Sequence, residues 1–159
     1  MSFKTLASML ACLALLACGF KAQVKSANLT GRTLVLAGNL ADQSFIHELR
    51  NQISLAHGHL SNHALEQAPT RLILSDLVSD KRLLVSGNYG QGQVYLLSAC
   101  LRVAIDNQPS QKLCSQRRMS ENYNQQLSNL SETSRLQAAI FIELISLILI
   151  KLGMYYGQS

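Results

Sequence analysis

The sequence contains no tryptophan and few other aromatic residues, with five tyrosines and four phenylalanines among 159 residues. Proteins that bind single-stranded nucleic acid stack the bases on aromatic side chains, so this scarcity argues against a nucleic-acid partner. Charged residues are also few, at 14%, whereas hydrophobic residues make up 48%. A chain of this composition can bury a hydrophobic core and does not belong to the disordered class.

Internal repeats, low-complexity runs and linkers are likewise missing from the body of the chain. The length suits one domain and hardly two. The formal net charge is +5, from 14 Lys and Arg against 9 Asp and Glu. This balance favours anionic partners such as nucleic acid, phosphorylated lipid or an acidic protein surface, and charge alone does not choose among them.

The sequence lacks a Ser/His/Asp or paired-carboxylate pattern, so we predict that the protein is not an enzyme; a triad assembled in space is the alternative. His57, His59 and His63 lie close together in the sequence, and the nearest acid is Glu66. A zinc site needs three or four convergent ligands. We therefore interpret the histidines as loop residues after a helix, and expect neither a metal nor a cofactor.

The N-terminal segment predicts the cellular compartment. Lys4 precedes an apolar stretch over residues 6–16, which is shorter than the roughly 20 residues needed to span a bilayer but suits a signal peptide. The stretch ends in Leu15-Leu16-Ala17-Cys18, which looks like a bacterial lipobox. This box predicts cleavage after residue 17 and lipidation of Cys18. The attached acyl chains would then hold the protein at a membrane, since several chains anchor a protein stably. The alternatives are a poorer box ending at Cys12 and an uncleaved anchor helix.

Gly19 follows the predicted lipidation site. An Asp at this position marks inner-membrane retention in many lipoproteins, so its absence predicts the outer membrane, on the periplasmic side. We divide the chain into a signal peptide (1–17), a lipid-anchored tether (18–31), a single domain (32–153) and a short C-terminal tail (154–159).

The hydrophobic patterns predict an α+β fold. Asp42 or Ser44 can cap a first helix over residues 43–57, with Gly58 as the left-handed C-terminal residue. Alternation of period two over residues 93–106 predicts a half-buried strand. The last helix is apolar almost all round and is therefore expected to be buried on more than one side. We predict a two-layer sandwich, in which a mostly antiparallel four-stranded sheet carries two helices on one face. The expected strands are 32–38, 71–86 (one strand with a bulge near Ser79-Asp80-Lys81, or two), 93–106 and 112–123, and the last helix is 131–152.

Several segments together resemble the LPS-assembly lipoprotein (LptE) family. The resemblance rests on the lipobox with Cys18-Gly19-Phe20, on Arg50-Asn51-Gln52-Ile53 with His57-Gly58, on Val94-Tyr95-Leu96, on the segment RRMSENYNQQL and on Leu149-Ile150-Lys151-Leu152. It implies a plug inside a large outer-membrane β-barrel, LptD, which the lipoprotein helps to assemble, and binding of lipopolysaccharide on its way to the cell surface. Basic residues that relatives place at the meander turn and before the last helix have no clear match here.

Lipopolysaccharide carries phosphates, which Arg and Lys on rigid elements can bind. If the odd-numbered residues of strand 93–106 face the core, Arg102 lies on the opposite face, and Lys112 and Arg118 share that face on the returning strand. These three cations are one candidate phosphate site, and the alternative is an ordinary solvated surface. Lys81 and Arg82, expected in a bulge or turn, are a second candidate.

Cys100 and Cys114 fall on the same outer face, on strands that one hairpin joins. A disulfide between them is one prediction, because the periplasm is oxidising; two free thiols packed as small apolar groups are the alternative. An auxiliary lipoprotein of another envelope lipid-transport system and a lipoprotein hydrolase are the alternative functions.

Overall fold

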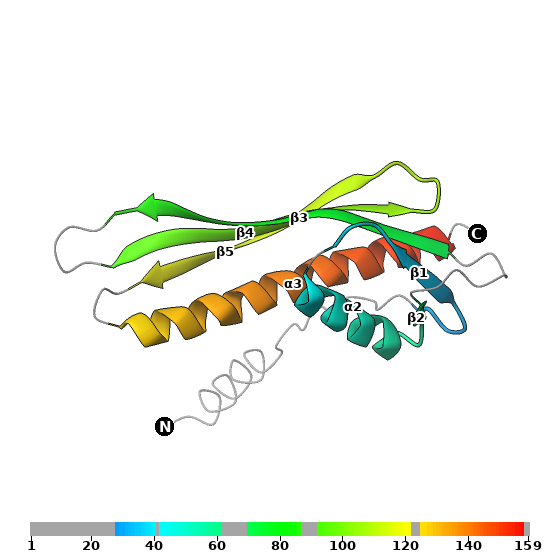
Figure 1. The fold of residues 1–159 in the computed structure, drawn as a ribbon, viewed down its shortest axis with the longest axis horizontal. Helices are drawn as coiled ribbons and strands as arrows, with labels where there is room; N and C mark the ends of the chain where they lie inside the picture. The colour runs from blue at the N-terminus through cyan, green and yellow to red at the C-terminus, as the bar shows by residue number, and fades with distance from the viewer. Residues whose placement is uncertain (1–27, 41, 62–69, 87–91, 122–124, 158–159) are drawn as a thin grey trace, which may run out of the picture.

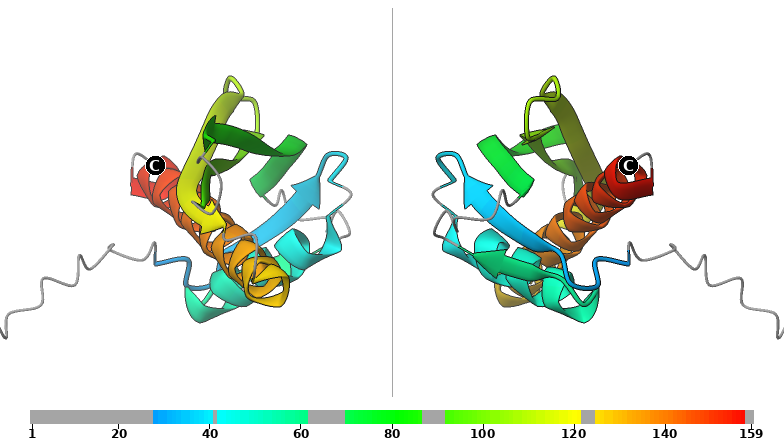
Figure 2. Two further views of the ribbon diagram at one scale, coloured as in Figure 1. Left: turned by 90° about the vertical axis from the view of Figure 1, so that its left-hand side faces the viewer. Right: turned by 90° about the vertical axis from the view of Figure 1, so that its right-hand side faces the viewer.

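The computed structural model describes residues 28–40, 42–61, 70–86, 92–121 and 125–157. Five strands form one sheet in the order β2-β1-β3-β4-β5, and the helices α2 and α3 lie on one side of it (Figure 1; Figure 2). The predicted two-layer α+β fold is confirmed. The sheet has one more strand than we predicted and is mixed, because β1 runs parallel to both of its neighbours. The elements are β1 (Thr33–Ala37), α2 (Gln43–Leu55), β2 (His59–Ser61), β3 (Thr70–Val85), β4 (Gln93–Ile105), β5 (Gln111–Glu121) and α3 (Gln126–Gly157).

The ends of α2 follow from local chemistry. The Asp42 carboxylate accepts a hydrogen bond from the backbone N–H of Phe45 at 3.1 Å, as an N-cap does. At the other end His57 adopts the left-handed conformation, with φ of 60°, where we expected Gly58. A Cβ on Gly58 would lie 2.9 Å from the Cβ of Leu29. Gly58 is therefore needed for close packing, and not for its φ angle.

A β-bulge in β3 determines which side chains face the helices. Ser75 pairs with Arg102 and Val78 with Cys100, so two β3 residues, Asp76 and Leu77, lie opposite one residue of β4. Asp76 has a φ of 54° there. The extra residue reverses the alternation of faces along β3. The bulge lies before the segment where we expected it, and a second irregularity lies between Leu83 and Val85.

The long helix α3 covers β4 and β5 and also contacts α2. By length and composition alone this helix would suffice to cross a membrane. Here, however, one side of the helix forms the core with the sheet. Its seven buried residues are Ile140, Phe141, Leu144, Ile145, Ile148, Leu149 and Leu152. Their side chains meet those of α2, for example in the edge-to-face contact between Phe45 and Phe141.

The folded domain is longer at both ends than the predicted 32–153. Leu29, which we placed in the tether, is fully buried and its N–H donates to the carbonyl of Ala56. The last helix continues to Gly157, where the Tyr155 hydroxyl donates to Asp106 at 2.7 Å. This hydrogen bond raises the pKa of the Tyr155 phenol above its ordinary value. It also joins the end of α3 to the turn between β4 and β5.

Candidate functional site

The face of the sheet that points away from the helices is called the outer face below. On β4 the buried residues are Leu97, Ala99, Leu101, Val103 and Ile105, together with Ala104 near the end of the strand, so the even-numbered residues up to Arg102 point outward. The register places side chains of β3, β4 and β5 in rows across this face. The rows are Val85–Val94–Ser120, Arg82–Leu96–Arg118, Asp80–Ser98–Gln116, Val78–Cys100–Cys114 and Ser75–Arg102–Lys112.

The first candidate trio lies on this outer face but in two places. Arg102 lies directly opposite Lys112, whereas Arg118 lies opposite Leu96. Six residues of a strand correspond to roughly 20 Å, so one phosphate cannot contact all three cations. Arg102 also forms an ion pair with Asp76 at 3.4 Å. With Lys112 it lines a hollow of about 440 Å³ that also contains Asp76 and Asp80, so the charge there is mixed.

The second candidate pair divides between the two faces. Lys81 and Arg82 lie in a regular paired part of β3, opposite Leu97 and Leu96; our expectation of a bulge or turn there was wrong. Lys81 points toward the helix side, where it forms an ion pair with Glu121 and lies 4.3 Å from the centre of the Tyr95 ring. Arg82 points to the outer face. Lys81 is therefore occupied in holding strands together, and Arg82 is available.

Arg82 and Arg118 flank Leu96 in a single row, which we call the arginine row. Within the part of the chain that the structure describes, the side chains of Arg82, Arg118 and Lys112 have no ion-pair or hydrogen-bond partner. The two arginine Cα atoms are about two strand spacings apart, roughly 10 Å. The next row adds the apolar side chains of Val85 and Val94. The arginine row thus combines two available guanidinium groups with an apolar strip.

The cysteines of the outer face are joined in a disulfide between Cys100 and Cys114, with their Cα atoms 4.1 Å apart. This distance is typical of a pair of opposite residues that exchange no backbone hydrogen bonds with each other. The disulfide lies between the Arg102–Lys112 pair and the arginine row, and it links β4 to the edge strand β5.

Arg117, which precedes Arg118 on β5, points to the helix side, because it lies opposite the buried Leu97. Its guanidinium lies 2.6 Å from the carboxylate of Glu143 on α3, and the buried Ser115 hydroxyl donates to the same carboxylate at 2.8 Å. Glu143 interrupts the apolar stretch of α3 in the sequence because it fastens the helix to β5.

The remaining predictions concern the lipidation site Cys18 and the three histidines that follow the first helix. Cys18 and His63 lie outside the described residues. His57, just after α2, and His59, the first residue of β2, are both exposed. Among the residues described, no group of three His, Cys, Asp or Glu side chains is arranged to hold a metal ion.

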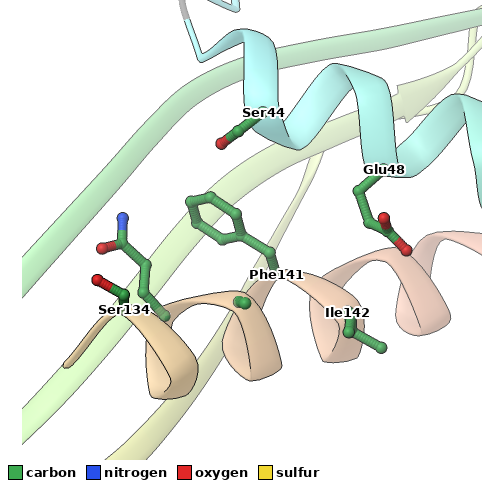
Figure 3. A pocket seen from close by; sticks show the side chains of 7 residues that line it. Ser44, Glu48, Ser134, Phe141 and Ile142 are labelled. Atoms are coloured by element: carbon green, nitrogen blue, oxygen red, sulfur yellow. The ribbon is translucent and has the colours of Figure 1, made fainter. Parts of the chain in front are cut away.

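A second concavity lies between the two helices. Figure 3 shows Ser44 and Glu48 of α2 facing Ser134, Phe141 and Ile142 of α3. The space measures about 350 Å³ and has hydroxyl and carboxylate groups above an apolar floor. Glu48 is also bonded to Gln52 at 2.8 Å. The Glu48 carboxylate is therefore partly engaged within α2. The residues that line this cleft include no cation that would attract a phosphate.

The similarity of this chain to known proteins lies in its fold. No family model and no curated protein sequence matches the chain. Solved structures do match. A minor lipoprotein from Acinetobacter baumannii has a TM-score of 0.64 at 17% identity, covering 80% of this chain and 95% of its own.

Two further neighbours have similar statistics. An uncharacterized lipoprotein B from Nitrosomonas europaea has a TM-score of 0.66 at 16% identity, covering 87% of this chain and 93% of its own. The rare lipoprotein B from Shewanella oneidensis has a TM-score of 0.63 at 15% identity, covering 80% and 98%. This chain therefore shares its fold, over almost the whole length of each neighbour, with proteins described as bacterial lipoproteins.

Proposed function

We propose that the chain is a lipid-anchored outer-membrane lipoprotein that binds lipopolysaccharide and acts as the plug and assembly partner of an LptD-type barrel. The lipobox at Cys18, the resemblance to the LPS-assembly lipoproteins and the fold shared with bacterial lipoproteins support this proposal. The observation that carries lipopolysaccharide binding is the arginine row, with Arg82 and Arg118 on either side of Leu96.

The chemistry of the arginine row suits a phosphorylated lipid. Guanidinium groups bind phosphate through charge-assisted, often bidentate hydrogen bonds. Neither arginine has to break an existing ion pair within the described structure before it binds an anion. Leu96, Val94 and Val85 offer apolar surface beside the cations, where acyl chains can lie. Arg102, by contrast, would have to leave Asp76.

Lipopolysaccharide binding is tested with the double variant Arg82→Gln, Arg118→Gln. We expect its affinity for labelled lipopolysaccharide to fall by about tenfold or more, since two charged contacts are lost. The salt dependence of binding should flatten, because exposed charges are screened over about 10 Å at 0.1 M salt. Arg102→Gln is the matched control on the same face and should bind nearly as the wild type. Equal affinities for both variants would contradict the assignment of the arginine row.

The anchor and the partner are tested separately. Cys18→Ala should block lipidation and leave an unprocessed precursor; normal processing of this variant would refute the lipobox.

The detergent-solubilised lipoprotein should co-purify with a large outer-membrane barrel. Co-purification with components of a different lipid transporter would instead support the auxiliary-lipoprotein alternative, and residue-specific turnover of an envelope substrate would support the hydrolase.

A further inference from the structure

One side of β3 is paired over only a short part of its length. β1 pairs with β3 through Leu34 to Ala37, opposite Thr70 to Ile73. The strand continues to Val85, and from Leu74 onward no described strand lies on that side. In Figure 1 this stretch forms the upper boundary of the left half of the sheet. The regular part of this edge, residues 78–83 between the two irregularities of β3, is about as long as a typical complete strand.

The register shows which backbone groups this edge presents. Cys100 and Cys114 form a pair without mutual backbone hydrogen bonds, judged by their Cα distance of 4.1 Å. The N–H and C=O groups of even-numbered β4 residues therefore point toward β3, where they pair with Val78, Asp80 and Arg82. Alternation along β3 then directs the N–H and C=O groups of Ser79, Lys81 and Leu83 to the edge. Such a row of backbone groups is a template for one more strand.

A small pocket lies beside this edge on the helix side. It measures about 170 Å³, so it has room for one aliphatic side chain. Its floor is apolar, and the aliphatic stem of Lys81 can line its rim, because the ammonium group is held by Glu121. The pocket exists because α3 packs against β4 and β5, while β1 pairs with only the first part of β3. The floor is Leu97, Ala99 and Ile140, and the rim includes Ser79, Lys81, Thr133 and Gln137.

We propose that an extended segment of a partner protein adds to the sheet along Ser79–Leu83 and places an aliphatic side chain in this pocket. A polypeptide strand is the ligand that satisfies alternating backbone donors and acceptors, and the pocket then selects one side chain. The bulges at Asp76 and near Leu84 mark the two ends of the segment that the added strand would pair with. This proposal is independent of lipopolysaccharide binding, which uses the outer face.

A second copy of the chain is a poorer occupant of the same edge. Strand pairing of two β3 edges about Lys81 would place the two Lys81 side chains opposite each other on the helix side. Like charges directly opposite each other on paired strands are destabilising. The edge of β5 is also less suited, because α3 packs directly beneath that strand and Arg117 and Ser115 there are bonded to Glu143.

The test uses the detergent-solubilised full chain and a labelled peptide of alternating threonine and valine with a central leucine. We expect saturable binding. The variant Ser79→Pro removes an N–H from the edge without removing a β3–β4 hydrogen bond, and it should weaken binding by about tenfold or more. Gln116→Pro makes the same change at the edge of β5 and is the matched control, with unchanged affinity. Replacing the central leucine with glycine should weaken binding to both the wild type and the control.

Modified peptides keep the test decisive if Ser79→Pro does not fold. Two peptides carry N-methyl groups on alternate amides. In the first peptide all the methyl groups lie on one edge of the strand, and in the second they all lie on the other edge. Only the peptide whose methyl groups face β3 should lose binding to the wild-type chain. Absence of binding, equal loss for both peptides, or equal affinities of Ser79→Pro and Gln116→Pro would overturn the proposal. The proposal would also be overturned if the wild-type chain bound no peptide but formed a dimer that Ser79→Pro dissociates. The occupant of the edge would then be a second copy of the chain.

Discussion

The two ends of the molecule are built from the same sheet and the same long helix, yet they differ in the number of helices that cover the sheet. The proximal half comprises β1, β2, α2, the start of β3 and the second half of α3 (right and centre of Figure 1). The distal half comprises residues 78–85 of β3, 93–99 of β4, 115–121 of β5 and 126–137 of α3. In the proximal half two helices cover the sheet, whereas in the distal half α3 covers it alone.

Burial follows this difference. Phe45, Leu72 and Ile145 of the proximal half have no solvent-exposed surface. In the distal half Val78 is 61% exposed, and Leu127 and Leu130 on α3 are 85% and 65% exposed. We infer that the proximal half supplies most of the free energy of folding, since burial of apolar surface is its main source. The distal half carries the arginine row and the unpaired edge of β3, as expected of a binding region held by a stable scaffold.

The largest contrast is expected between Ile145→Asp and Leu130→Asp on the same helix. Ile145 is fully buried, so an unpaired carboxylate there should cost several kcal/mol, about 4 or more, and should prevent folding and assembly with a partner. Ile148→Asp should act in the same way. Leu130→Asp, in the distal half, should change the free energy of unfolding by less than about 0.5 kcal/mol. Urea titrations followed by circular dichroism measure both. Similar losses in the two halves would refute our division of the molecule.

Loss of the disulfide should rank second. The bond joins residues separated by 14 positions, and closing a loop of this length stabilises a protein by about 3 kcal/mol. We expect the double variant Cys100→Ala, Cys114→Ala to unfold at lower urea concentration than the oxidised wild type. A reductant should lower the midpoint of the wild type and leave that of the variant unchanged. A wild type whose midpoint does not respond to reductant would show that the bond contributes nothing to stability.

The N-cap of α2 should have a smaller effect, which depends on pH. Asp42→Ala should lower the free energy of unfolding by about 1 kcal/mol at neutral pH. The hydroxyl of Ser44 and the backbone N–H of Phe45 donate to the Asp42 carboxylate and lower its pKa. A lowered pKa in the folded state means stabilisation above the unfolded pKa that disappears as the pH falls through the folded pKa. The difference between wild type and Asp42→Ala should therefore shrink below about pH 4.

Asp42→Asn is the control for this experiment. It keeps a capping oxygen but has no titratable group, so it should retain much of the stability without the pH dependence. If Asp42→Asn lost stability with the same pH profile as the wild type, another carboxylate would be responsible.

The smallest change in stability is expected at the arginine row. Arg82→Gln and Arg118→Gln should each alter the free energy of unfolding by less than about 0.5 kcal/mol, because both side chains are exposed and neither has a partner in the described structure. Arg117→Gln, by comparison, removes the ion pair to Glu143 and should cost up to about 1 kcal/mol. Thermal unfolding compares the three variants. A marked loss at Arg82 or Arg118 would indicate a structural role for the arginine row.

The local features of this protein follow from short stretches of the chain, because the interactions that produce them act within a few residues. The alternation along residues 93–106 correctly predicted five buried side chains of β4, because a strand turns successive side chains to opposite faces; they are Leu97, Ala99, Leu101, Val103 and Ile105. Ala104 on the opposite face is buried as well, and Tyr95 is only half-buried. The same parity placed Arg102, Lys112 and Arg118 on one face and put Cys100 near Cys114. Of the two N-cap candidates, Asp42 and Ser44, the structure has Asp42 at the start of α2, where its carboxylate accepts a hydrogen bond from an N–H group of the first turn.

Other features depend on contacts between segments that are distant in the sequence, and these could not be predicted from local patterns. The bulge at Asp76 is accommodated by pairing with β4, and it reverses the alternation of β3, so that Arg82 and not Lys81 reaches the outer face. β2 is a strand only because β1 offers it an edge; its three residues carry too little pattern to predict one. Which cations remain available was also decided in space, because Asp76, Glu121 and Glu143 approach Arg102, Lys81 and Arg117 only after the chain has folded.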